Sequence, residues 1–489
     1  MPRAQAAHER LPNLQALPIL SSDALSSVAY ATEASLGVLI LAGSSALKQS
    51  LPITVAIIAL IVIVVLSYRQ AISAYPNGGG SYVVARENLG RNVSLVAAAA
   101  LLIDYTLTAA VSLMAGTQAL SSLLPPLLPH ELALSLLLLA LVGWANLRGL
   151  REAGRVFAIP TYIFVVMILL LTLVGVTDLS FHHGWTPEPP PLEAALQPLG
   201  LFLILRAFSS GCSAMTGIEA ISTGVQVFRE PAARNARVTL LVMGGLLSAM
   251  LLAVTGLGFM YGIAPDSQVT VLAQIGIRVF GSGSILFWLL QLSTLLILVL
   301  AANTAFAGFP LLAAMLAEDR CLPPQMRWLG DRLVYQNGIG VLLAVSALII
   351  WICHGDTTVA VNLYALGVFT AFTLSQLGLV LHWFRLRGPG WQGRMALNAL
   401  GALSTFVVLL VIIVSKFTEG AWTVVIALPL VVWGLALIRR RSREVQGLIA
   451  PDPCMEPLFL EPNAALPRHH AIVWLAGLNE PSFEAERYA

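Results

Sequence analysis

The residue with the clearest chemical potential is an aspartate inside an apolar run. Asp104 stands in LLIDYTLTAAVS (101–112), and Thr108 follows it by one helical turn on the same face. Asp104 lies eleven residues into the apolar segment 93–124, about 16 Å along a helix and near the middle of a hydrocarbon layer about 30 Å thick. No helix-capping role exists at that depth. A carboxyl there must be protonated or hold a cation.

A second polar face follows the N-terminus, in SSDALSSVAYATEA (21–34). Asp23, Ser26, Ser27 and Tyr30 are spaced i, i+3, i+4 and i+7, which puts a carboxylate and three hydroxyls on one helix face. The serine pair also favours local unwinding, because its hydroxyls compete for backbone hydrogen bonds. The alternative is a cytoplasmic helix cap made by one of the first polar residues of this segment.

The third polar stretch is AFSSGCSAMTGIEAISTG (207–224), whose density of serine and glycine indicates a broken span with exposed backbone groups. Thr216 and Glu219 are three residues apart and can share a face. Tight helix packing through small residues is the alternative. That alternative explains Gly211 and Gly217 but leaves Glu219 without a reason.

Three further residues are less specific. Tyr364, in VNLYALGVFTAF (361–372), can offer its hydroxyl inward, although a tyrosine near a span end is often an interfacial anchor. Arg206 either snorkels outward or pairs with a carboxylate, and both options stay open. Glu33 stands off the face of Asp23 and receives no role.

Catalytic and metal chemistry find no support in the sequence. It contains no nucleophile–base pair and no clustered metal ligands, so we expect no enzyme, no cofactor and no nucleic-acid partner. The glycine-rich segment YPNGGGSYVVARENLG (75–90) lacks the GKS/T of a phosphate loop. It is either a flexible connector or part of an inner gate. The four cysteines have no ligand spacing and read as small apolar residues: Cys212, Cys321, Cys353 and Cys454.

The composition indicates which kind of structural element holds these polar residues. Hydrophobic residues make up 57% of the 489 positions and charged residues 11%, with a net charge of +2 and a mean hydropathy of +0.83. Soluble domains carry about 25% charged residues, so most of this chain faces lipid or itself. Breaking it at Pro, Gly and Arg clusters predicts an all-α polytopic membrane protein with twelve transmembrane helices: 18–44, 51–68, 93–124, 131–147, 157–178, 199–223, 236–263, 284–317, 339–354, 358–384, 398–416 and 420–438.

The distribution of basic residues predicts the orientation. With the N-terminus inside, 21 Lys and Arg fall in cytoplasmic segments, and only Lys48, Arg278 and Lys416 fall outside. Both termini are therefore expected in the cytoplasm of a cell whose inner membrane holds the chain, with no cleaved signal peptide. We expect a cytoplasmic N-terminus (1–17), a transporter core (18–440) and a cytoplasmic tail (441–489). The breaks in spans one and six favour a five-plus-five inverted repeat with its site at the midplane.

Four motifs in order then carry a family resemblance: SSDALSSVAYATE, YPNGGGSYVVARENLG, LLIDYTLTAAVS and SGCSAMTGIEAIS. Over about residues 17–440 the chain resembles the KimA-type potassium importers of the APC (amino acid–polyamine–organocation) superfamily. The resemblance implies a LeuT-like fold and proton-coupled potassium uptake. It also implies that potassium is held by Asp23, Tyr30, Asp104, Thr108, Thr216, Glu219 and Tyr364. Relatives carry a substantial cytosolic domain that supports dimerisation, of which only AIVWLAGLN (471–479) is recognisable here, so a homodimer stays open.

The charge of the site decides between substrates. An amino acid permease of the same superfamily uses backbone amides of a Gly-Ser-Gly break to bind an α-carboxylate, whereas this chain reads DALSSVAY there. Asp23, Asp104 and Glu219 would repel a carboxylate and attract a monovalent cation. Because three acids exceed the charge of one such ion, at least one of them is expected to carry the coupled proton. A receptor or scaffold without flux would not need these acids.

Overall fold

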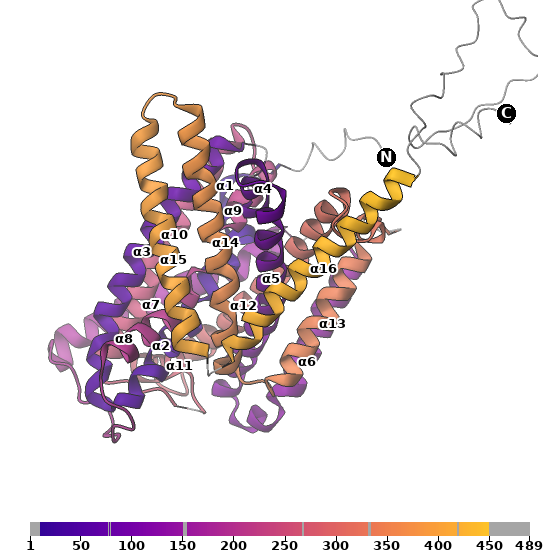
Figure 1. The fold of residues 1–489 in the computed structure, drawn as a ribbon. Helices are drawn as coiled ribbons and strands as arrows, with labels where there is room; N and C mark the ends of the chain where they lie inside the picture. Colours follow the sequence, from indigo (N-terminus) through magenta and orange to yellow (C-terminus); the bar gives the residue numbers. More distant parts are fainter. Residues whose placement is uncertain are drawn as a thin grey trace, which may run out of the picture.

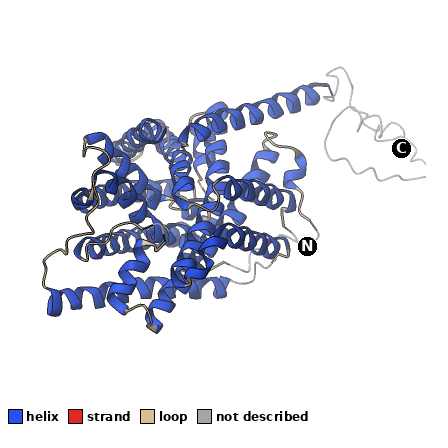
Figure 2. Ribbon diagram, turned by 90° about the horizontal axis from the view of Figure 1, so that it is seen from below, coloured by secondary structure: helices blue, strands red, loops and turns tan. Residues whose placement is uncertain are grey.

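The computed structural model describes residues 10–76, 78, 80–149, 154–266, 268–330, 334–417 and 420–448. Figure 2 shows that this part of the chain is helical throughout, with no β-strand among the described residues. A single parallel bridge joins Leu11 to Phe228. Residues 441–448 of the predicted tail are helical, whereas its remaining residues 449–489, with AIVWLAGLN, and the first nine residues of the chain lie outside the described part.

The α-helices follow the apolar segments expected from the sequence. Their bounds are α1 Asn13–Ser26, α2 Val28–Leu39, α3 Ser50–Ala74, α4 Ser81–Asn88, α5 Arg91–Leu123, α6 Glu131–Leu147, α7 Gly154–Asp178, α8 Leu201–Gly211, α9 Ala220–Thr223, α10 Ala232–Met260, α11 Val271–Phe280, α12 Ile285–Glu318, α13 Gln336–Ile352, α14 Thr357–Leu386, α15 Trp391–Lys416 and α16 Ala421–Leu448.

Among the described residues, eleven helical segments are long and apolar enough to cross a membrane. The difference from the expected twelve lies at 339–354, which corresponds to α13. Its 17 residues reach about 25 Å, slightly less than a hydrocarbon layer of about 30 Å. The twelve-helix count therefore stays a prediction.

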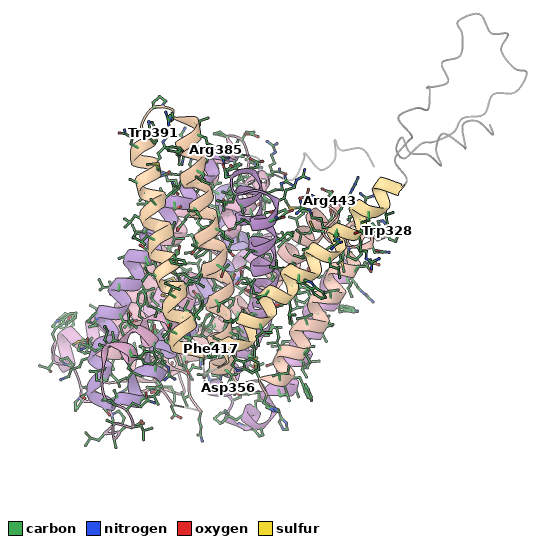
Figure 3. All side chains as sticks on the ribbon, viewed as in Figure 1. Trp328, Asp356, Arg385, Trp391, Phe417 and Arg443 are labelled. Carbon is green, nitrogen blue, oxygen red and sulfur yellow. The ribbon has the colours of Figure 1, made fainter. Side chains whose placement is uncertain are left out.

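The helices pack around α5, which is mostly buried and contacts α12, α14, α4 and α6. Figure 1 shows α16 running obliquely along one edge of the bundle, and only 17% of its apolar stretch is buried. The side chains labelled in Figure 3 mark two ends: Arg385, Trp391 and Arg443 at one, Asp356 and Phe417 at the other. The basic residues of α14 and α16 thus lie together, as the orientation argument expects.

Two apolar segments are interrupted where the sequence is rich in small polar residues. The first is divided at Ser27, between α1 and α2, although the Ser27 backbone keeps right-handed helical angles (φ −62°, ψ −20°), so a broken first span stays a prediction. The second leaves α8 through the 3-10 helix Cys212–Met215. Thr216 is then extended (ψ 151°), Gly217 is left-handed (φ 75°), and α9 begins three residues later. Backbone groups at an interruption like the second can bind ligands, because they lack helical partners.

Candidate functional site

Asp104 sits inside the bundle because α14 approaches α5 closely at that level. A Cβ on Gly367 would lie 3.0 Å from the Ala100 carbonyl oxygen and 3.6 Å from the Asp104 Cβ, so only glycine permits this approach. The Asp104 side chain is 2% exposed. Its position in the middle third of the 33-residue α5 agrees with the depth expected from the sequence.

The close approach of α14 also brings Tyr364 onto the polar face of α5. The Tyr364 hydroxyl and the Thr108 Oγ1 are 2.7 Å apart in a buried hydrogen bond. Tyr364 is fully buried and interacts electrostatically with Asp23, Tyr30 and Asp104. The alternative role as an interfacial anchor is therefore wrong.

Asp23 comes from the last part of α1, near the interruption at Ser27. Because α1 begins at Asn13, Asp23 lies within the helix, and the helix-cap alternative is wrong. Both serines donate hydrogen bonds to backbone carbonyls. The Ser26 Oγ donates to the Asp23 carbonyl at 2.9 Å. Ser27 Oγ contacts both the Ala24 carbonyl and the Ala214 carbonyl, the latter at 3.0 Å. The two interrupted segments are thus tied to each other.

The shared helical face expected for Thr216 and Glu219 is wrong, because residues 216–219 are not helical. Glu219 instead precedes the first residue of α9, and Thr216 lies beside the Tyr30 hydroxyl. Gly217 makes this turn possible. Its φ is 75°, and a Cβ there would lie 2.7 Å from the Asp23 Oδ2, so the turn packs directly on the Asp23 carboxyl.

The three acids from these elements meet in one buried cluster. The Asp104 and Glu219 carboxyls lie close enough to interact directly, and two buried negative charges at such range repel each other. Asp23 interacts electrostatically with both. Glu219 is 3% and Asp23 6% exposed. Among the described residues one oxygen of each acid has no hydrogen-bond partner: Asp23 Oδ1, Asp104 Oδ1 and Glu219 Oε2.

The structure therefore brings all seven predicted site residues into one cluster, while their role as ion ligands stays a prediction. Within the described part of the chain no three His, Cys, Asp or Glu side chains stand close enough to hold one metal ion among them. A cation here would need the neutral oxygens of Tyr30, Thr108, Thr216 and Tyr364 as well. Such a mixed oxygen set suits a hard cation of low charge.

A cavity of about 220 Å³ adjoins this cluster. Its lining includes Asp23, Glu219 and Tyr105, together with Pro18 and Val227.

The glycine-rich segment 75–90 packs beside this cavity, against its lining residue Thr223. A Cβ on Gly78 would lie 3.0 Å from the Thr223 carbonyl oxygen, and one on Gly80 would lie 2.9 Å from the Thr223 Oγ1. The segment therefore touches the end of α9 backbone to backbone. This contact favours the gate interpretation over a loose connector.

Sequence reasoning missed two tyrosines. Tyr68, at the end of α3, is buried beside Glu219 and Asp104, and its hydroxyl is 3.0 Å from the Ser81 Oγ. Tyr105 interacts with all three acids. Tyr68 precedes a basic residue that marks the end of a span, so the sequence offered no signal for it. The adjacency of Tyr105 to Asp104 was a signal, but neighbours along a helix point to different faces.

Glu33 and Arg206, which the sequence left without a role, both interact with other parts of the chain. The Glu33 Oε2 accepts a hydrogen bond from the Val271 amide at 3.3 Å, which ties α2 to α11. Arg206 is engaged in an interaction of its own. Neither residue belongs to the acid cluster.

Comparison with known proteins agrees with this geometry. The family model described as "Amino acid permease" matches residues 19–436. The chain is also 44% identical over 434 residues to the "Potassium transporter KimA" of Bacillus subtilis (strain 168). That match covers 88% of this chain and 71% of the relative. The resemblance drawn from the four motifs is thereby confirmed.

Proposed function

This chain belongs to the amino acid permease family and groups with its KimA-type transporters, and on that premise we propose that it imports potassium by proton symport. One observation carries the proposal: Asp23, Asp104 and Glu219 meet as a buried cluster. They come from three separate elements of the bundle. Buried acids without basic partners need a cation or a proton.

The cluster favours a cation over an amino acid. An amino acid would have to bring its α-carboxylate against three acids, whereas potassium loses its hydration and gains their oxygens. The hydroxyl pair Thr108–Tyr364 supplies neutral oxygens at 2.7 Å from each other. The relative of Bacillus subtilis is named for potassium transport, which agrees with this choice.

Alternating access through a LeuT-like five-plus-five repeat would move the ion. The interruptions at Ser27 and at residues 212–219 are the elements expected to rock or unwind around a fixed site. The cavity past Pro18 would be the inner pathway, and the segment 75–90 would cover it. Both termini would then lie in the cytoplasm, with the chain in the cell's inner membrane.

Proton coupling follows from the contact between Asp104 and Glu219. A proton shared between these two neighbouring carboxyls would leave the pair with a single negative charge. Loading potassium beside a singly charged pair outside, and releasing both ions inside, keeps the buried charge low throughout the cycle. The proton and the ion would therefore move in the same direction.

Flux into proteoliposomes containing the purified chain tests this proposal. We expect rubidium or potassium uptake that rises as the external pH falls and drops when a protonophore is added. Leucine or arginine uptake with no response to potassium would contradict the substrate. Potassium uptake indifferent to both pH and protonophore would contradict the coupling and leave a uniporter.

A proton-coupled amino acid permease is the second candidate. The family description supports it, and backbone amides near residues 212–217 could bind a carboxylate. The same flux assay separates the two candidates, because amino acids would then compete with labelled substrate and potassium would not.

A further inference from the structure

A second polar cavity, of about 280 Å³, lies apart from the acid cluster. It is enclosed by α4, the first turn of α5, the end of α12 and the end of α16. Arginines dominate its lining: Arg86, Arg91, Arg320, Arg439 and Arg443. Figure 3 shows Arg443 at the end of α16 that shares a level with Arg385, which is the end predicted to face the cytoplasm.

The acids of this cavity do not balance its arginines. Asp319 accepts from the Arg86 guanidinium at 2.6 Å and from the Tyr82 hydroxyl at 2.5 Å, so one acid and one arginine neutralise each other. Glu318 is the remaining acid of the lining, and it is exposed. Four guanidinium groups thus face one free carboxylate, which leaves the cavity positive.

Arg439 is the buried member of this set, at 9% exposure. Its Nη1 donates to the Arg91 carbonyl at 3.3 Å and to the Asn92 Oδ1 at 3.5 Å, both neutral acceptors at long distance. In the described part of the chain it has no carboxylate within ion-pair distance. Arg443 follows one turn later on α16, and like charges at this spacing repel each other. A bound anion would give Arg439 an oppositely charged partner and would reduce its repulsion from Arg443.

The backbone adds two features that suit an anion. α5 begins at Arg91 after Gly90, which provides no side-chain cap, so the first amides of a 33-residue helix are available. Arg320 holds a left-handed conformation (φ 61°) just after α12, where glycine is usual. This turn places Arg320 in the wall of the cavity.

We propose that this arginine cavity binds a phosphate group, supplied by the headgroup of an anionic phospholipid. Guanidinium groups and helix N-termini both recognise phosphate oxygens. The lipid source is favoured because one wall is α16, whose apolar stretch is only 17% buried and would meet acyl chains directly. Basic pockets on the cytoplasmic side of helical bundles recognise lipid headgroups in this way.

The test is lipid binding by the full-length chain, measured by native mass spectrometry in detergent. The probes are phosphatidylglycerol, phosphatidylcholine and inorganic phosphate. Arg443→Gln removes a lining charge at an exposed position, so folding should survive. Arg441→Gln is the matched control, because Arg441 is exposed on the same helix and does not line the cavity. We expect Arg443→Gln to raise the Kd for phosphatidylglycerol about fivefold, and the control to leave it nearly unchanged.

Each outcome decides the proposal. Preferential binding of phosphatidylglycerol that depends on Arg443 and not on Arg441 supports it with a lipid source. Inorganic phosphate binding with the same dependence, and no preference for the anionic lipid, supports the phosphate site with a soluble source. Equal losses in the two variants, no loss in either, or no binding of any probe to the unaltered chain would overturn it. Potassium flux does not enter this readout, so failure here is separate from failure of the proposed transport.

Discussion

Replacing Gly217 by alanine should damage ion binding more than any other single methyl group added to the chain. A Cβ at this position would lie 2.7 Å from the Asp23 Oδ2, 2.8 Å from the Asp23 Cβ and 2.9 Å from the Ala24 amide nitrogen. Ordinary contact begins at 3.4 Å, so α1 or the turn must move by about 0.5 Å or more. Two of these atoms belong to a helix backbone or its first side-chain carbon and cannot rotate away.

The magnitude follows from two costs. Alanine at a φ of 75° costs about 1–2 kcal/mol relative to glycine, and overpacking adds about 1–3 kcal/mol. Because the strain falls on Asp23 itself, we expect the Gly217→Ala protein to need about ten- to a hundredfold more potassium for half-maximal uptake. Its melting temperature should also be lower.

Gly37→Ala is the matched control. Gly37 lies within α2, in the same apolar segment as Asp23, and a Cβ there would meet nothing within 4 Å. Alanine should favour the helix by about 1 kcal/mol, so this variant should melt no lower than the unaltered protein and transport normally. Equal potassium dependence and equal melting in the two variants would refute the geometry drawn around Gly217.

Three further predictions concern single contacts. Thr108→Ala removes the 2.7 Å partner of Tyr364 and should raise the half-saturating potassium concentration by about tenfold or less, since water can replace one neutral oxygen; a loss as large as that from removing a buried acid would contradict this. Tyr82→Phe deletes the hydroxyl that donates to Asp319 and should lower the melting temperature without changing the potassium dependence of uptake. A changed potassium dependence would contradict this prediction and link α4 to the ion site. The pKa of Glu230 is lowered by hydrogen bonds from the Ala232 amide and then from Arg10, so its stabilising contribution is present above the ordinary value of 4.5 and is lost as the pH falls through the lower folded value. The protection factor of the Leu11 amide, which donates to the Val227 carbonyl, should fall as the pH drops below 4.5, and an unchanged protection factor would contradict the assignment.

The sequence predicted which polar residues lie deep inside the apolar segments. It did not predict the backbone conformation around them. Asp104 could be placed because a helix has a fixed rise and the apolar segment around it has clear ends. Glu219 was singled out as an acid that tight helix packing does not explain, and it is buried, yet its expected helical face was wrong. A stretch of Ser, Gly and Ala does not say which residue takes the left-handed turn, and Gly211 and Gly217 looked alike before the structure assigned φ 75° to the second.

Contacts between distant segments were beyond the sequence for a different reason. Tyr68 lies beside the cluster because α3 packs against α9, next to Glu219, and nothing local in either segment encodes that contact. The approach of α14 to α5 depends on Gly367, one of 39 glycines in the chain. The helix at the expected span 339–354 is α13, whose 17 residues leave the twelfth span a prediction.

The most direct test of the central claim is potassium uptake by proteoliposomes at limiting potassium, comparing the unaltered chain with Asp104→Asn. Asparagine keeps the size and one acceptor oxygen but removes the charge that offsets the loss of ion hydration. Losing one partner of a buried charge pair costs about 3–5 kcal/mol, so the half-saturating potassium concentration should rise by about two to three decades, with the protein still folded by its melting temperature. Normal uptake by folded Asp104→Asn at limiting potassium would contradict the site and the function built on it.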